Sequence, residues 1–207
     1  MIDSPAFPET LPDTTDAMAQ PYVTLEAFEK EYLCREDEFK YEWVDGRVIQ
    51  TKRDMNQYQF FMLDNLLDLF TKLKAAGQVT GRLYVEADTK FLPKAHRRPD
   101  MAWFSDEQVF AMANRKNQVP QFVIEIISNH DEVDDLLDKL RNYWDADVKV
   151  IWLISANTKQ VQVFNGRTSI VCTDDMTCSA APVLPAFQLT ANEIFKMPTP
   201  PEPAETA

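Results

Sequence analysis

The chain has 207 residues, of which 45% are hydrophobic, enough for one globular domain with a sizeable core. No apolar run approaches the roughly 20 residues of a membrane-spanning helix, and no secretory signal is expected at the N-terminus. The formal net charge of −12 counts against an extended nucleic-acid-binding surface, because such surfaces are usually basic.

Acidic, proline-rich segments frame the chain. Residues 1–21 and 198–207 hold six of the twelve excess negative charges and eight of the thirteen prolines. Such segments bury too little apolar surface to offset the entropy of ordering, so we expect two disordered tails and one domain over residues 22–197. The three cysteines form neither a disulfide framework nor a CxxC pattern, which is typical of reduced thiols in a cytoplasmic protein.

The predicted elements follow in chain order. Residues 23–33 predict a helix capped by Thr24. Residues 39–51 alternate in polarity around Asp45-Gly46, which predicts a hairpin. Asp54 is a candidate cap for a long helix over residues 55–77 that ends at Gly77.

The second half of the chain alternates between strands and helices. Strands are expected within residues 82–92, 99–105, 121–128, 149–155, 159–166 and 169–173, with helices over residues 131–147 and at the end of residues 183–195. This order predicts an α/β fold: a mixed central sheet flanked by helices, with an N-terminal helix and hairpin.

One carboxylate interrupts an otherwise apolar strand. Glu125 lies between Ile124 and Ile126, and alternation places it on one face with Val123 and Ile127. An unpaired buried carboxylate costs several kcal/mol, so protonation, a charged partner or a metal ion is expected there. A salt bridge to a helix is the alternative explanation.

A second carboxylate precedes a neighbouring strand. Asp100 follows Pro99, and proline is restricted to the start or edge of a strand, so Asp100 is expected at a strand mouth. Its alternative role is that of a turn or cap residue. Two carboxylates about 4 Å apart repel by about 4 kcal/mol at an effective dielectric near 20. A divalent cation relieves this repulsion, and Mg²⁺ is often held by one or two carboxylates with waters and phosphate oxygens.

A lysine on the following helix is a candidate partner. The apolar stripe of residues 131–147 runs along Val133, Leu136, Leu137, Leu140 and Trp144. Lys139 and Tyr143 are four residues apart and lie together at the edge of that stripe. Lys139 can therefore turn inward toward Glu125, although a lysine that extends along the surface is the alternative.

Six stretches follow one another at characteristic spacing: "YEWVDGRVIQ", "RRPDMAWFS", "FVIEIIS", "DKLRNYW", "VKVIWLIS" and "VLPAFQLTANEIF". Together they resemble the Uma-two family of restriction endonucleases, within the PD-(D/E)xK nuclease superfamily, and the resemblance spans about residues 23–195. It implies a restriction-endonuclease-like core and a metal-dependent endonuclease that hydrolyses DNA with Mg²⁺ or Mn²⁺.

The resemblance also assigns residues. Asp100 matches the PD aspartate and Glu125 the acidic residue of the (D/E)xK element. The lysine expected two residues later is Ile127 here, and Lys139 matches the lysine that the family takes from the next helix. Glu42 matches an early acid that joins the metal site, and a further aspartate matches Asp134 or Asp135.

The remaining expectations concern partners. Basic residues just before Asp100, among them Lys94, Arg97 and Arg98, are candidates for contacts to DNA phosphates, with a solvated loop as the alternative. A homodimer is expected, with the N-terminal hairpin or the strand in residues 159–166 at its edge. Two other functions stay open: a catalytically inactive nuclease-fold module for binding or scaffolding, and a two-carboxylate glycosidase.

Overall fold

The computed structural model describes residues 21–53, 57–127 and 133–199. Most of the two predicted tails and the predicted cap Asp54 lie outside these ranges. No helix in the described ranges is long and apolar enough to cross a membrane.

The N-terminal part folds as the sequence predicts. The elements are α1 (Leu25–Glu31), β1 (Phe39–Val44) and β2 (Arg47–Lys52). The Thr24 side chain caps α1 by accepting a hydrogen bond from the Ala27 backbone N–H at 3.1 Å. Asp45 and Gly46 both have positive φ, at 46° and 85°, which two-residue hairpin turns require. The predicted helix and hairpin are confirmed.

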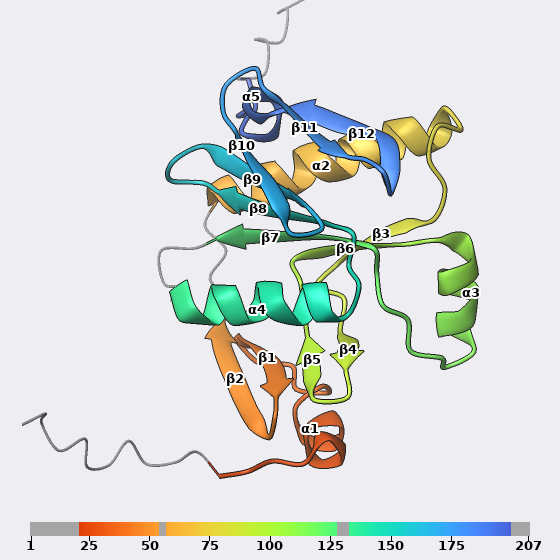
Figure 1. Ribbon diagram of the computed structural model, residues 1–207, viewed down its shortest axis with the longest axis vertical. Helices are drawn as coiled ribbons and strands as arrows, with labels where there is room; N and C mark the ends of the chain where they lie inside the picture. Colours follow the sequence, from red (N-terminus) through yellow and green to blue (C-terminus); the bar gives the residue numbers. More distant parts are fainter. Residues whose placement is uncertain (1–20, 54–56, 128–132, 200–207) are drawn as a thin grey trace, which may run out of the picture.

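A six-stranded sheet forms the centre of the molecule (Figure 1). Its order is β10 (Thr168–Cys172), β9 (Gln160–Asn165), β8 (Val150–Ser155), β7 (Phe122–Ile127), β6 (Met101–Phe104) and β3 (Arg82–Val85). The β7–β8 pair is parallel and the other pairs are antiparallel, so the predicted mixed sheet is confirmed. The parallel pair is joined by α4 (Val133–Asp145), as a parallel connection requires a crossover.

Helices cover both faces of this sheet. One face packs against α2 (Gln57–Ala75), β11 (Thr177–Ala180), β12 (Leu184–Thr190) and α5 (Ala191–Ile194), and the other against α4 and α3 (Asp106–Ala113). Side chains alternate along β7, so Ile124 and Ile126 join the first core and Val123 and Ile127 the second. Glu125 therefore points toward α4.

A second sheet lies on the α4 side of the molecule (Figure 1). Its order is β2, β1, β5 (Ala95–Arg97) and β4 (Thr89–Leu92). Strand β5 falls in the basic stretch that one interpretation of the sequence assigned to a solvated loop. All three of its residues are buried, because the sheet places their side chains against neighbouring elements that supply partners.

The sheet order changes one expectation about assembly. The strand in residues 159–166 is β9, which pairs with both β8 and β10, so it offers no free edge to a second copy. The outer strands of the central sheet are β10 and β3. The homodimer stays a prediction. The prediction that the strand in residues 159–166 lies at its edge is wrong, because β9 is paired on both sides.

Candidate active site

Asp100 and Glu125 lie opposite each other across two paired strands, Asp100 directly before β6 and Glu125 within β7. Met101 of β6 pairs with Ile124 of β7, and the next position on each strand carries the carboxylate. Asp100 Oδ2 also accepts the backbone N–H of Ile126 at 2.7 Å, which fixes the orientation of its carboxylate. The two acids that the sequence places on neighbouring strands are therefore brought together.

Glu125 receives two side chains from α4. The hydroxyl of Tyr143 donates a hydrogen bond to its Oε1, and Lys139 Nζ lies 3.5 Å from its Oε2. These donors are one helical turn apart, as the spacing of four predicts. Only 18% of the Lys139 side chain is exposed, so Lys139 turns inward and does not extend into solvent.

Glu42 joins the same cluster from β1. Its Oε2 lies 3.6 Å from Lys139 Nζ and 3.2 Å from Arg97 Nη1, and its Oε1 accepts the backbone N–H of Arg98 at 2.8 Å. Glu42 is 2% exposed. Lys139 thus bridges two carboxylates, on β1 and β7, that are far apart in the sequence.

Lys40 completes the cluster and was missed by the sequence analysis. Its Nζ lies 2.9 Å from Asp100 Oδ1. Tyr41 and Trp43 pack with α1, and alternation along β1 turns Lys40 and Glu42 to the opposite face. The sequence could have indicated Lys40 through this alternation, since a lysine two residues from a site glutamate on the same strand projects toward the same site.

These charges shift one another's protonation. Burial alone would raise the pKa of the Glu42 carboxyl, but the charges of Lys139, Arg97 and Lys40 outweigh it and hold its pKa at about 2. For Glu125, burial dominates over Lys139 and Lys40 and its pKa is raised. Burial opposes the charged form of Lys139, yet Glu125 and Glu42 raise its pKa above the ordinary value. Burial likewise opposes the charged form of Lys40, but Asp100, Glu125 and Glu42 raise its pKa, so both lysines are cations at neutral pH.

The depressed pKa of Glu42 predicts a pH-dependent contribution to stability. Its pKa falls from an ordinary 4.5 to about 2 on folding, so ionised Glu42 stabilises the fold above about pH 4.5 and this stabilisation is lost as the pH falls toward about 2. In urea denaturation, the difference in unfolding free energy between wild type and Glu42→Gln should shrink across this range. The raised pKa of Glu125 acts with the opposite sign, and it is raised less in Glu42→Gln because the charge of Glu42 contributes to it. A difference that does not vary with pH would contradict the prediction.

Residues 25–192 match the model of the Uma2 family, described as "Putative restriction endonuclease". The chain belongs to the Uma2 family. The match spans the strands and helix that carry Glu42, Asp100, Glu125 and Lys139, and it confirms the resemblance read from the sequence.

A solved structure has the same fold as this Uma2 protein. It is described as the crystal structure of a putative nuclease belonging to DUF820 from Anabaena variabilis ATCC 29413. The TM-score is 0.70 at 18% identity, and the match covers 84% of this chain and 97% of that chain. The predicted nuclease-type α/β fold is confirmed. No curated protein matches the sequence.

The basic residues before Asp100 are engaged within the Uma2 fold. Arg97 is 1% exposed and binds Glu42 and Asn142, and Arg98 is 5% exposed and binds Asp88. Lys94 is exposed and paired with Asp45 at 2.8 Å. The two guanidinium groups thus face carboxylates of the protein itself, because burial of an arginine requires such a partner.

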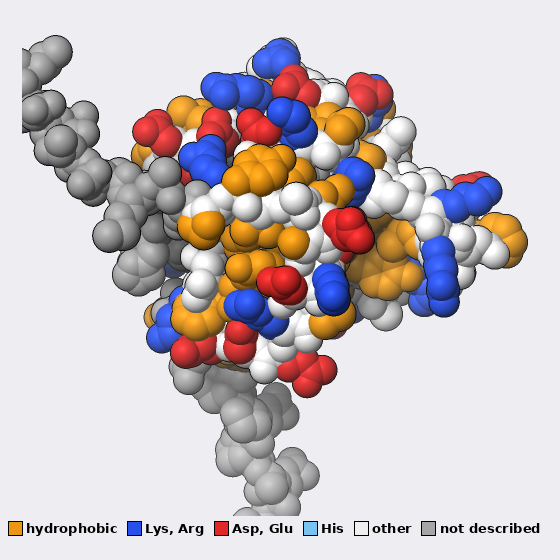
Figure 2. All heavy atoms as spheres, turned by 90° about the horizontal axis from the view of Figure 1, so that it is seen from below, with side chains coloured by type: hydrophobic (Ala, Val, Ile, Leu, Met, Phe, Trp, Pro, Cys, Tyr) orange, Lys and Arg blue, Asp and Glu red, His pale blue; other side chains and the backbone are white. Residues whose placement is uncertain are grey.

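The face of the molecule that is seen from below relative to Figure 1 carries mixed charge. Figure 2 shows acidic and basic side chains interspersed on this face around a central hydrophobic area. The formal charge of −12 and this interspersed pattern differ from the uniformly basic face of an extended nucleic-acid-binding surface.

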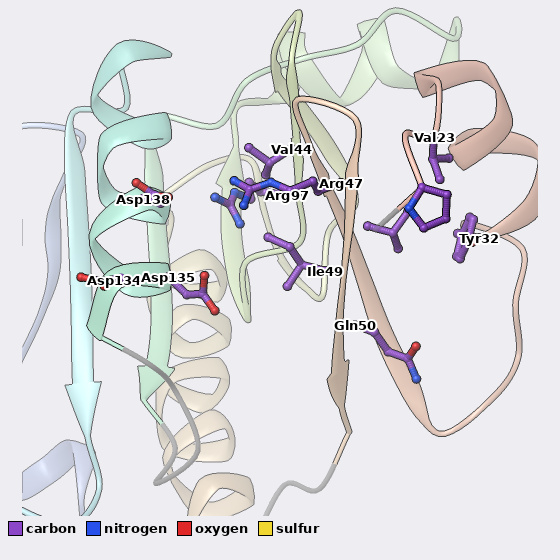
Figure 3. A pocket seen from close by; sticks show the side chains of 12 residues that line it. Val23, Tyr32, Val44, Arg47, Ile49, Gln50, Arg97, Asp134, Asp135 and Asp138 are labelled. Carbon is purple, nitrogen blue, oxygen red and sulfur yellow. The ribbon is translucent and has the colours of Figure 1, made fainter. Parts of the chain in front are cut away.

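A cleft of about 800 Å³ leads toward the cluster between α4 and the β1–β2 hairpin (Figure 3). Asp134, Asp135 and Asp138 of α4 line one side, and Ile49 and Arg97 line the other. Both candidates for the further family aspartate therefore lie in the cleft, with their exposed carboxylates outside the buried cluster. Arg97 connects the two regions, since it lines the cleft and also binds Glu42.

The donor set of the cluster fits a divalent cation. Asp100, Glu125 and Glu42 supply carboxylate oxygens, the ligands that Mg²⁺ and Mn²⁺ prefer. The carboxylates already hold a cation, because the Lys40 ammonium lies against Asp100 and is further stabilised by the charges of Glu125 and Glu42. Within the described ranges, no group of three or more His, Cys, Asp or Glu side chains is arranged as a complete metal site. A metal ion at these acids would therefore require the lysines to rearrange.

Proposed function

We propose that this Uma2 protein is a metal-dependent endonuclease that hydrolyses phosphodiester bonds of DNA with Mg²⁺ or Mn²⁺. One observation carries the proposal. Asp100, directly before β6, lies opposite Glu125 within the paired strand β7, and Lys139 reaches Glu125 from the next helix, at 3.5 Å. This set supplies metal ligands and a cation beside them in a protein of a nuclease family.

Asp100 and Glu125 are the principal metal ligands in this proposal. Their carboxylates come from adjacent strands of the central sheet, which holds them at a defined separation. Glu42 is an auxiliary ligand and also positions Lys139, to which its Oε2 is bound at 3.6 Å. Tyr143 orients Glu125 by donating a hydrogen bond to Oε1, which leaves Oε2 directed toward Lys139.

The reaction is the addition of water across a phosphodiester bond. A water oxygen forms a bond to phosphorus, the bond from phosphorus to the leaving oxygen breaks, and a proton passes by way of solvent from the water to the leaving oxygen. The ion, when bound, supplies polarisation of the phosphoryl group and of the water. Lys139 orients the water and stabilises the negative charge that develops on the phosphate. Its position between two carboxylates keeps it protonated for this role.

The test is a plasmid-nicking assay combined with calorimetry. Supercoiled DNA is incubated with wild type in Mg²⁺, in Mn²⁺ and in excess chelator, and Mg²⁺ binding is titrated separately. We expect cleavage with either metal and none with chelator. Asp100→Asn should lose both cleavage and Mg²⁺ binding, because an amide oxygen carries no charge to hold the ion.

The matched control is Asp147→Asn. Asp147 is an exposed aspartate paired with Lys149 at the surface, and asparagine tolerates its positive φ of 64°. This variant should cleave and bind metal like wild type. If wild type shows no metal-dependent cleavage, or if Asp100→Asn cleaves equally well, the proposal fails and the non-catalytic binding module becomes the better account.

A further inference from the structure

The Lys40 ammonium occupies the interior of the acidic cluster. Its Nζ lies 2.9 Å from Asp100 Oδ1, and only 11% of its side chain is exposed. Glu125 and Glu42 add to the favourable electrostatic environment of this ammonium. A buried lysine that is bound to one carboxylate and interacts electrostatically with two more is unlike a surface lysine, whose charged end extends into water.

Each carboxylate oxygen of the cluster receives a donor from the protein. Asp100 accepts from Lys40 and from the Ile126 N–H. Glu125 accepts from Tyr143 and Lys139. Glu42 accepts from the Arg98 N–H and is also bound by Arg97 and Lys139. Three carboxylates thus face the three cations Lys40, Lys139 and Arg97, and the cluster is neutral. A divalent ion adds two positive charges, so its binding is favourable only if a resident cation moves or negative charge arrives.

Asp100 determines which cation moves. Its Oδ2 is bound to the backbone N–H of Ile126 at 2.7 Å, so the carboxylate is held in one orientation by the strand. An ion that approaches Asp100 therefore meets Oδ1, where the Lys40 ammonium lies. Lys139 and Arg97 are each held by further partners, Lys139 by two carboxylates and Arg97 by Glu42 and Asn142.

We propose that Lys40 is a further catalytic residue of this site. Its ammonium neutralises Asp100 in the metal-free protein, is displaced from Oδ1 when the metal binds, and then contacts the phosphate of the bound DNA. This inference rests on the proposed nuclease function and adds a group that neither the family match nor the sequence motif assigns.

Charge balance supports the proposed contact between the displaced Lys40 ammonium and the DNA phosphate. A DNA strand brings a negative charge at each phosphate, which offsets the surplus left by the metal. The four-carbon stem of lysine lets its ammonium change partner within one site. Lys40 and Glu42 lie two residues apart on β1 and therefore on the same face of the strand, so a displaced ammonium stays close to the acids of the site.

The test compares Lys40→Met with wild type in two measurements. Calorimetric titration with Mg²⁺ alone should show roughly tenfold tighter binding to the variant, because the competing cation is gone. Single-turnover cleavage of duplex DNA at saturating Mg²⁺ should be slower by about tenfold or more, because a cation is lost from the phosphate. These opposite effects distinguish the proposal from a purely structural salt bridge, whose loss would weaken both properties.

Two further variants keep the test decisive. Lys40→Gln retains a hydrogen-bond donor for Asp100 without the charge, so it covers the case in which the methionine variant does not fold, and it should shift Mg²⁺ affinity in the same direction. Lys149→Met removes a lysine from an ion pair with Asp147 outside the cluster and should change neither measurement.

The outcomes separate this inference from the proposed function. Unchanged or weaker Mg²⁺ binding by both Lys40 variants, in a protein whose wild type cleaves DNA, overturns the role of Lys40 and leaves the nuclease proposal intact. Tighter Mg²⁺ binding with an unchanged cleavage rate overturns the phosphate contact. A wild type that neither binds Mg²⁺ nor cleaves DNA overturns both proposals.

Discussion

Replacement of Lys139 by methionine is expected to slow metal-dependent DNA cleavage by about 100-fold, the typical effect of removing one group that stabilises transition-state charge. The Lys139 ammonium lies 3.5 Å from Glu125 and 3.6 Å from Glu42, so it is fixed beside the proposed metal ligands. Methionine keeps the length and apolar stem of the side chain but supplies neither the charge nor a hydrogen-bond donor. Single-turnover cleavage at saturating Mg²⁺ measures the effect.

Measurement of Mg²⁺ binding distinguishes the proposed role of Lys139, stabilisation of charge on the phosphate, from that of the acids, which bind the metal. The carboxylates stay in place in Lys139→Met, so calorimetry should show Mg²⁺ affinity no weaker than in wild type, in contrast to Asp100→Asn. Lys149→Met is the matched control, because Lys149 pairs with Asp147 at the surface. A cleavage rate equal to that of wild type in Lys139→Met would remove Lys139 from the mechanism.

Replacement of Arg97 by alanine is expected to lower the free energy of unfolding by about 3–5 kcal/mol, the usual consequence of removing one partner of a buried ion pair. The Arg97 and Glu42 side chains are 1% and 2% exposed, with Arg97 Nη1 and Glu42 Oε2 3.2 Å apart. Without Arg97, Glu42 stays buried and loses one of its positive neighbours. Asn142 also loses the Nε–H that it accepts at 2.9 Å. Urea denaturation monitored by tryptophan fluorescence measures the change.

Two comparisons define the origin of this loss. Arg141→Ala removes an arginine from an exposed pair with Asp138 and should alter stability little. The double variant Glu42→Leu/Arg97→Met replaces the pair with apolar side chains and should recover part of the stability, since no buried charge is left unpaired. A loss in Arg97→Ala as small as that in Arg141→Ala would show that the buried pair contributes little.

The placement of Arg97 and Arg98 also limits what a basic stretch predicts. The sequence presents Arg97 and Arg98 beside Asp100, which is compatible with a rim that contacts DNA. In the structure, Glu42 and Asp88 bind these guanidinium groups, and Glu42 is 55 residues away in the chain. A count of nearby charges carries no information about such distant partners.

The sequence by itself determined the features that depend on local periodicity. Alternation along residues 122–127 placed Glu125 on one face of a buried strand, and the spacing of four put Lys139 and Tyr143 at one edge of a helix. The Asp45-Gly46 pair predicted the hairpin, because few residues adopt its positive φ values. These properties arise from the geometry of single elements, so a short stretch of sequence contains them.

Only the tertiary structure decided which elements meet. Lys40 lies 60 residues from Asp100 in the chain, and the two meet because β1 pairs with β5, the strand that directly precedes Asp100 and β6. Strand β5 has little apolar periodicity and is stabilised by partners from other elements, which is why the sequence analysis did not find it. The sequence therefore supplied the acids and the lysine of the helix, whereas the second lysine and the buried arginine pair followed from long-range packing.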